Sequence, residues 1–140
     1  MTDWLIPDEL APSTSGSMGP LYEAAHEGRL AMPFCDECGL VLEVEQVTCD
    51  RCGGKPRWRD VEPAGHVHSC TAVHRREPGL VLAEEPYQVL DIELSTGHRL
   101  VMTTQVAPGH QYRIGERVTI GFRRVGGVAL PAVASTLGTI

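Results

Sequence analysis

Hydrophobic and polar residues alternate with a period of two along much of the second half of the chain. The clearest case is the stretch 117–125, in which Val118, Ile120 and Phe122 alternate with polar or small residues. This period indicates a strand that buries one face. The same pattern, broken by turn residues, predicts five strands at about 65–75, 87–94, 98–106, 117–125 and 128–134. Five short strands without a long helix are typical of a small Greek-key barrel of the OB type, which closes on itself and removes exposed edges.

The first thirty residues follow a different pattern. Residues 1–18 contain a run of small residues, Pro, Gly and Ser, which predicts a flexible N-terminal arm. Near its start, Trp4-Leu5-Ile6 is an apolar cluster that docks either on the protein's own surface or on a partner's. Hydrophobic residues then recur at helical spacing, which predicts an N-terminal helix over residues 19–30, with Pro20 in its first turn and Gly28 as a stop signal.

Two Cys-x-x-Cys-Gly units follow the helix, with ten residues between the inner cysteines. Two such turns present four thiolates to one cation in a tetrahedron, and zinc is the usual occupant. The glycine after each second cysteine lets the chain bend so that backbone N–H groups point at the sulfurs. A dithiol redox pair and a disulfide framework are the rival interpretations, but either leaves the paired glycines unexplained. Residues 31–60 are therefore interpreted as a zinc ribbon, with one structural Zn²⁺ per chain bound by Cys35, Cys38, Cys49 and Cys52.

Within this ribbon, residues 31–34 and 40–44 have the pattern of short strands. Trp58 follows the second cysteine pair and is expected to cover the joint between the ribbon and the main domain. A module of this size buries little, so the metal supplies much of its folding energy. Because four thiolates leave no open position for water or a substrate, the predicted site is structural.

Composition and charge restrict the ligands and the cellular compartment that we expect for the protein. Residues 1–50 hold ten acidic side chains against one basic, or −9, and residues 51–140 hold eight against eleven, or +3, which gives the total of −6. The second half would therefore tolerate an anionic ligand or partner, and the first half would repel one. No apolar run approaches the roughly 20 residues that span a bilayer, and the N-terminus does not resemble a signal peptide. Five cysteines, four of them at metal-type spacing, suit a reducing compartment, so we expect a cytoplasmic protein.

The sequence contains no convincing catalytic set. His66, His68 and Cys70 alternate on one predicted strand and would share a face, which would suit a nucleophile with its base or a second metal. Neighbours on one strand point in parallel, however, and no third metal ligand is evident, so their role stays open. Asp91 and Glu93 are interpreted as a polar strand face rather than an acid–base pair. We expect no catalytic residue in this chain, and its cofactor-binding residues stay unknown apart from the zinc ligands.

Several short motifs in a fixed order resemble a known family. They are Gly28-Arg29-Leu30, the paired Cys-x-x-Cys-Gly units, Trp58 before a glycine-led strand, Ser69–Arg75, Pro86-Tyr87 and Ile114–Val118. In these the chain resembles, over about residues 21–134, the bacterial and archaeal zinc-ribbon/OB-fold proteins called domain of unknown function 35, or acyl-CoA-associated OB-fold proteins. The resemblance implies a mainly β fold, with the N-terminal helix, a rubredoxin-like zinc ribbon and a C-terminal five-stranded OB-fold barrel over residues 61–140.

The resemblance also implies a function. Members of the family are typically found with thiolase-like enzymes, namely thiolases, acyltransferases and the aldolases that shorten steroid side chains held as CoA thioesters. The thiolase-fold chain carries the catalytic groups, and the small protein is a non-catalytic accessory subunit that binds it in a hetero-oligomer. We therefore expect a required subunit of a thiolase-like lyase or acyltransferase complex. Direct contact with the acyl-CoA is left open.

Single-stranded nucleic acid is the alternative ligand, because zinc ribbons and OB barrels are both used to bind it. Such binding needs a basic groove with aromatic stacking platforms. Here the net charge is negative, and the predicted barrel offers only Tyr87, Tyr112 and Phe122. The arginines of the barrel, among them Arg75 and Arg117, would equally suit CoA phosphates or an acidic partner. Nucleic acid is therefore the less favoured hypothesis.

Overall fold

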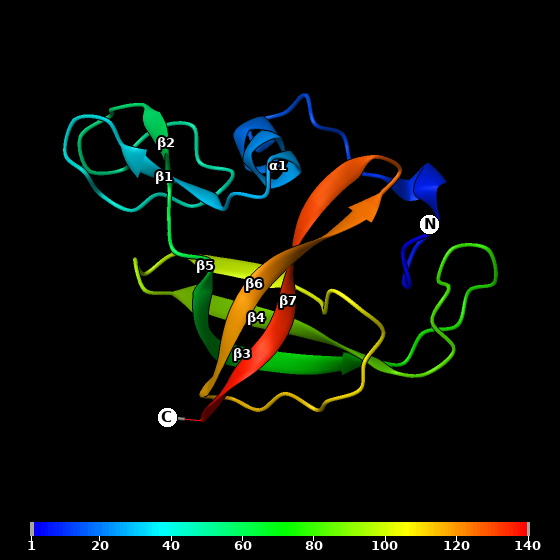
Figure 1. Cartoon of the computed structure of the whole chain (residues 1–140). Coiled ribbons are helices and arrows are strands. Elements are labelled where there is room, and N and C mark those ends of the chain that lie inside the picture. Colours follow the sequence, from blue (N-terminus) through cyan, green and yellow to red (C-terminus); the bar gives the residue numbers. More distant parts are fainter. Residues whose placement is uncertain (1, 140) are drawn as a thin grey trace.

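The computed structural model describes residues 2–139, and the side chains of residues 2–134. Within this range the chain forms an α-helix, α1 (Gly19–His26), and a short 3-10 helix, η1 (Asp8–Leu10). The strands are β1 (Ala31–Cys35), β2 (Pro56–Asp60), β3 (Ala64–Val73), β4 (Tyr87–Leu94), β5 (Arg99–Met102), β6 (Glu116–Val125) and β7 (Val128–Thr139). Figure 1 shows β1 and β2 beside α1, above a barrel made by β3 to β7. The expected mainly β fold is confirmed.

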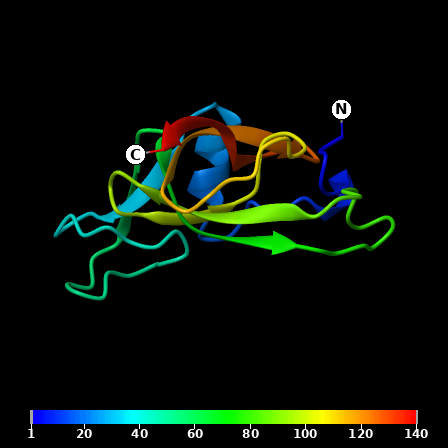
Figure 2. The ribbon, with the colours of Figure 1, turned by 90° about the horizontal axis from the view of Figure 1, so that it is seen from below.

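The barrel is a single antiparallel sheet in the order β5-β4-β3-β6-β7. The sheet curls until its two ends meet, where Thr104, just after β5, forms a parallel bridge with Val133 of β7 (Figure 2). Backbone hydrogen bonds flank the bridge, from Gln105 N to Val133 O (2.8 Å) and from Val133 N to Thr103 O (2.9 Å). Because these residues close the barrel, β5 is shorter than the predicted strand 98–106. The nearly closed five-stranded barrel is the OB architecture predicted from the alternation.

The inward faces of the strands fill the barrel. Leu90 and Ile92 of β4 are fully buried, and Val118 and Ile120 of β6 are buried between more exposed neighbours. This burial explains the period of two in the sequence, since each strand turns one face to the core. β3, β4 and β6 begin and end within two residues of the predicted strands, whereas β7 continues to Thr139.

The helix, the ribbon and the barrel share one core. Leu21 of α1 and Met32 of β1 lie in the same buried cluster as Val67 and Ile120 of the barrel, and Met32 is 0% exposed. Trp58 of β2 packs against this cluster, as predicted for the joint between the ribbon and the barrel. The ribbon is therefore packed on the barrel through apolar contacts as well as connected to it by the chain.

The ribbon strand predicted at residues 40–44 is wrong. β1 instead pairs with β2 over its whole length. Residues 40–44 contribute a single bridge, between Val41 and Phe34. Leu42 is 1% exposed and packs against the cysteine cluster. The physical reason is that Leu40 and Leu42 pack against the cysteines. The chain follows the cysteine cluster here, so it does not continue as a paired strand.

The helix ends at His26, before the end of the predicted segment 19–30. Gly28 then takes a φ of +78°, a left-handed conformation that glycine adopts at little cost, as predicted for a stop signal. The N–H of Arg29 donates to Ala24 O (2.9 Å), and the chain turns into β1. No helix in the described part of the chain is long and apolar enough to cross a membrane.

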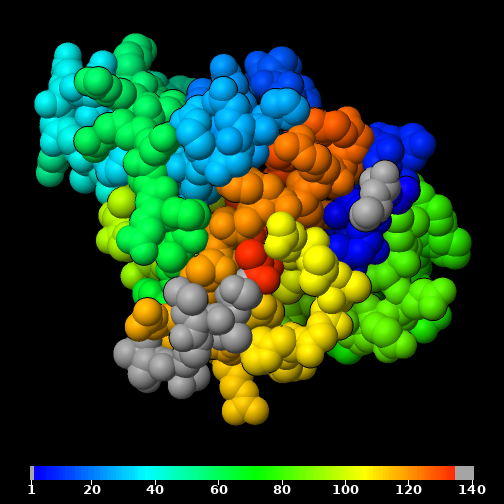
Figure 3. Space-filling model, in the orientation of Figure 1, coloured from blue at the N-terminus to red at the C-terminus, as the bar shows by residue number. Residues whose placement is uncertain are grey.

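The N-terminal arm packs on the barrel. Asp3 and Leu5 are buried, and the indole N–H of Trp4 donates to Thr104 O (2.9 Å). From the sequence, the apolar cluster in this arm could dock either on the protein's own surface or on a partner's. In the structure it docks on the protein's own barrel. Figure 3 shows the arm in dark blue between the orange segments of β6 and β7 and the green loop between β3 and β4. Residues 1 and 140, which end the first and last predicted segments, lie outside the described residues.

Candidate metal centre and barrel surface

The two Cys-x-x-Cys-Gly units form two matching turns. The N–H of Gly39 donates to Cys35 O (3.0 Å), and the N–H of Gly53 donates to Cys49 O (2.9 Å). Both glycines take positive φ values, +77° and +78°. A side chain would be strained in that conformation, which is why each turn ends in glycine. The first turn begins at the end of β1, so the ribbon strand fixes its position.

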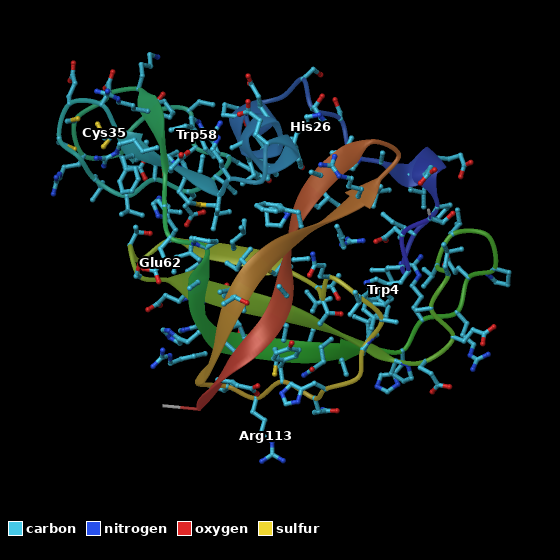
Figure 4. The ribbon with its side chains drawn as sticks, viewed as in Figure 1. Trp4, His26, Cys35, Trp58, Glu62 and Arg113 are labelled. Carbon is cyan, nitrogen blue, oxygen red and sulfur yellow. The ribbon has the colours of Figure 1, made fainter. Side chains whose placement is uncertain are left out.

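The turns bring four sulfur atoms together, all within 4.8 Å of one another. The Sγ atoms of Cys35 and Cys52 are 3.3 Å apart, and those of Cys38 and Cys49 are 3.7 Å apart. A tetrahedral zinc with about 2.3 Å bonds to sulfur has edges of roughly 3.8 Å. A Cβ atom at Gly54 would lie 2.6 Å from Cys35 Sγ, so the backbone approaches the sulfurs closely. Figure 4 shows the yellow sulfurs around Cys35, and among the described residues this is the one converging group of three or more metal-ligand side chains.

Hydrogen bonds within this cluster shift the thiol pKa values in opposite directions. The N–H of Leu40 and the guanidinium of Arg51 lower the pKa of Cys38 to about 6. At Cys52, the Gly54 N–H lowers the pKa, but hydrogen bonds shared with the neighbouring thiols outweigh it and raise the pKa to about 12. Without a cation, the four groups therefore share protons instead of all being ionised. Binding of a divalent cation would release these protons, and the donor set fits such an ion.

The predicted face with His66, His68 and Cys70 is wrong. A β-bulge after Val67 adds one residue to β3 where it pairs with β4, and this reverses the alternation beyond it. Nitrogens of His66 and His68 lie 3.9 and 3.8 Å from the Glu93 carboxylate on the outer face. Cys70 instead packs against the barrel core. The nucleophile and base considered from the sequence are therefore on opposite sides of the sheet.

The carboxylate of Asp91 binds an arginine of the next strand. Arg99 of β5 donates to Asp91 Oδ2 from Nε (3.0 Å) and from Nη2 (2.5 Å). The hydrogen bond to Asp91 raises the pKa of Arg99. This exposed cross-strand pair favours the interpretation of Asp91 and Glu93 as a polar strand face.

One buried histidine, His98, joins the ribbon to the barrel. It was not identified as a structural residue from the sequence. His98 is 3% exposed, with Nε2 2.8 Å from Pro33 O and Nδ1 2.5 Å from Thr96 Oγ1. Its ring meets Phe34 edge-on, with centroids 4.9 Å apart. Burial lowers the pKa of His98, and the bond to the Pro33 carbonyl opposes this only in part. The neutral ring therefore donates to Pro33 O, and no local signal marks a residue whose partner lies 65 positions away.

An open cleft of about 590 Å³ lies between α1 and the turn that joins β6 to β7. Tyr22 and His26 line the helical side, and Gly126 and Val128 line the other. Arg124 donates to His26 Nδ1 (3.2 Å) and to His26 O (3.3 Å), which ties the end of the helix to β6. The cleft is therefore a feature of the joint between the helix and the barrel.

The aromatic rings that nucleic-acid binding would use are buried or half-buried. Tyr112 is 7% exposed, and Phe122 packs against the core. Tyr87 lies beside Trp4, with the rings edge-on and their centroids 5.8 Å apart. Base stacking needs exposed ring faces, so this arrangement counts against the nucleic-acid alternative.

Comparison with known proteins establishes the fold. No family profile and no curated protein matches the sequence. A solved structure described as the "Ltp2-ChsH2(DUF35) aldolase" is similar, with a TM-score of 0.75 and 24% sequence identity over 89% of this chain and 98% of that chain. At this identity the likeness shows a shared fold. The fold implied by the resemblance to domain of unknown function 35 is thereby confirmed.

Proposed function

We propose that this protein is a non-catalytic accessory subunit that binds a thiolase-fold enzyme and supports its chemistry on acyl-CoA thioesters. The observation that carries the proposal is the fold shared with almost the whole of a chain in the Ltp2-ChsH2(DUF35) aldolase. The description of that structure pairs a protein of domain of unknown function 35 with a second component in an aldolase. By analogy of fold, this chain is a required subunit of a lyase or acyltransferase whose catalytic groups lie on its partner.

The described residues support a scaffold role for this chain. Of the two catalytic arrangements considered from the sequence, the Cys/His face is divided by the bulge in β3, and the carboxylates of Asp91 and Glu93 lie against Arg99 and two histidines on the outer face of the sheet. The cysteine cluster offers four ligands, which is the full set of a closed structural site. These observations favour a protein that presents surfaces to a partner over one that performs the reaction.

We assign zinc to the cluster, since four sulfur ligands in a tetrahedral arrangement are typical of structural zinc. When bound, the ion cross-links the two turns and neutralises part of the thiolate charge. These four cysteines and Cys70 form no disulfide among the described residues, which suits a reducing compartment, so we propose that the complex is cytoplasmic.

Freshly purified protein is expected to contain one zinc ion per chain. The reason is that the four sulfurs lie close enough to bind one cation together and leave no place for a second. Elemental analysis of protein purified without chelators measures the content, and a Cys49→Ser variant prepared in parallel is expected to lose the metal. Folded protein without metal, or with iron in its place, would contradict the assignment.

Affinity purification of the tagged protein from its native cell is expected to recover a thiolase-fold chain. The partner's activity on acyl-CoA thioesters should be largely lost when this subunit is removed and restored when it is added back. Mass spectrometry identifies the partner, and a thioester-cleavage or transfer assay measures the activity.

The matched control for this purification is Cys70→Ser, because that thiol lies outside the metal cluster and should not affect binding. A neighbouring thiolase-fold chain that is stable and fully active alone, and never binds this protein, would reject the proposed function. A salt-dependent shift of a labelled oligonucleotide at micromolar protein would instead favour the nucleic-acid alternative.

A further inference from the structure

Residues 3–11 of the N-terminal arm lie between two loops at one end of the barrel. Leu82, in the loop between β3 and β4, donates its N–H to Leu5 O (2.7 Å). At the other side, Gly126 in the β6–β7 turn donates its N–H to Asp8 Oδ1 (3.1 Å). Figure 1 shows the dark-blue arm between the green loop and the orange turn. The arm is therefore bonded to both loops.

These two loops border the position where OB barrels bind ligands. That position lies on the second and third strands, between the loop that joins the first two strands and the loop that joins the last two. Here the strands are β4 and β5. Trp4 contacts the ends of both, since its indole N–H donates to Thr104 O after β5 and its ring meets Tyr87, the first residue of β4. The arm thus occupies the place of a ligand, and Figure 4 shows Trp4 at this end of the barrel.

A buried ion pair holds the start of the arm. Asp3 Oδ2 lies 2.5 Å from Arg123 Nη1, and the two side chains are 1% and 12% exposed. The same oxygen accepts the N–H groups of Leu5 and Ile6, each at 3.1 Å. An uncharged group in place of the carboxylate would leave the arginine without its counter-charge in a dry site. The surface under the arm therefore fits a carboxylate that directly precedes a large aromatic residue, as Asp3 precedes Trp4.

Two observations indicate that the arm can be displaced. Residues 13–17, which link it to α1, are all exposed, so few contacts hold the linker. In addition, Arg123 Nε is buried and has no hydrogen-bond partner among the described residues. The arm therefore contacts the guanidinium through one nitrogen only, whereas the carboxylate of a replacing segment could accept from two.

We propose that the barrel surface under the arm is a recognition site for an extended peptide segment in which a carboxylate precedes a large aromatic side chain. Residues 3–8 cover this surface in the free subunit, and a segment of this kind from the partner enzyme replaces them. The identity of the partner rests on the proposed function, but the peptide chemistry does not. Because a tethered arm competes at an effective concentration of about millimolar, the replacing segment must belong to a partner already held at another surface.

The recognition site is tested in trans. The probe is a fluorescein-labelled peptide with the sequence of residues 2–12, and the protein is the full chain carrying Asp3→Asn and Trp4→Ala, which weakens the hold of its own arm and frees the recognition site. Fluorescence polarisation should show binding to this variant and at least about tenfold weaker binding to the wild type, whose own arm competes. A peptide with the same two replacements is the matched control and should not bind. Adding Arg123→Gln to the variant should abolish binding.

Failure of the freed variant to bind the peptide, with melting temperature and metal content like those of the wild type, would overturn the proposal. If that variant has a lower melting temperature than the wild type, the Asp3→Asn protein, which keeps Trp4, is tested in its place. The same binding results then support or overturn the proposal. Equal binding of the control peptide, or salt-dependent binding of an oligonucleotide in place of the peptide, would also overturn it. The assay contains no thiolase-fold enzyme, so its failure is distinct from failure of the proposed function.

The exchange itself is tested by hydrogen exchange in the purified complex. In the free protein the N–H groups of Leu5 and Ile6 are bonded to Asp3 and should exchange slowly. In the complex they should exchange faster, while the N–H of Leu82 stays protected because a partner carbonyl takes the place of Leu5 O. Unchanged protection of residues 3–8 would show that the arm stays on the barrel and would reject the exchange.

Discussion

Replacing Cys35 by serine is expected to release the metal, unfold residues 36–55 and abolish partner binding. Cys35 is 4% exposed and ends β1, so it anchors the cluster to the ribbon strand. Loss of one of the four thiolates should weaken zinc binding by more than about 100-fold, the upper range for losing an outer-shell partner. Since metal binding supplies the folding free energy of such a module, the turns should not persist. Metal content, amide exchange and co-purification measure the three effects.

The barrel is expected to survive this substitution. Leu21 of α1 and Met32 of β1 are buried in the core that the barrel shares, and these contacts do not involve the metal. Cys70→Ser is the matched control, because it removes a thiol outside the cluster and should leave zinc and partner binding unchanged. Retention of one zinc ion per chain in Cys35→Ser would contradict the assignment of the site.

Met32→Ala is expected to lower the free energy of unfolding of the whole chain by about 2–5 kcal/mol. Met32 is fully buried where the ribbon meets the barrel, so truncation removes apolar burial and leaves a cavity. Urea unfolding of the zinc-bound protein measures the change, which should move the midpoint without altering the m-value.

Val101→Ala provides the comparison for this measurement. Val101 is 65% exposed on β5, so its truncation should change the free energy of unfolding by no more than about 0.5 kcal/mol. If Met32→Ala instead shifted an early transition of the ribbon alone and left a later barrel transition unchanged, the shared core would not couple the two parts.

The sequence predicted best what depends on local geometry. The Cys-x-x-Cys-Gly units could be identified because the turn needs a positive φ after the second cysteine, as Gly39 and Gly53 show. The strands β4 and β6 could be placed because each buries one face, and residues such as Ile92 and Val118 mark that face at every second position.

Features that depend on distant contacts could not be predicted. The bulge in β3 follows from its pairing with a neighbouring strand, and nothing between His66 and Cys70 marks it. Residues 40–44 have the local pattern of a strand, but the need to cover the cysteine cluster determines their path. The arm was identified as a docking segment, yet its surface depends on an ion pair between residues 120 positions apart.

That separation also determines when the arm can reach its place during synthesis. Asp3 and Trp4 are translated before their partners, because Arg123 and Thr104 follow them by 120 and 100 residues. At about 5–20 residues per second, the arm waits roughly 6–24 seconds for its arginine. β7 must then emerge to close the barrel at Val133. The arm is therefore translated before the surface that it binds and becomes native only after that surface has formed, and a ribosome stalled before β6 would carry a nascent chain with Trp4 still exposed.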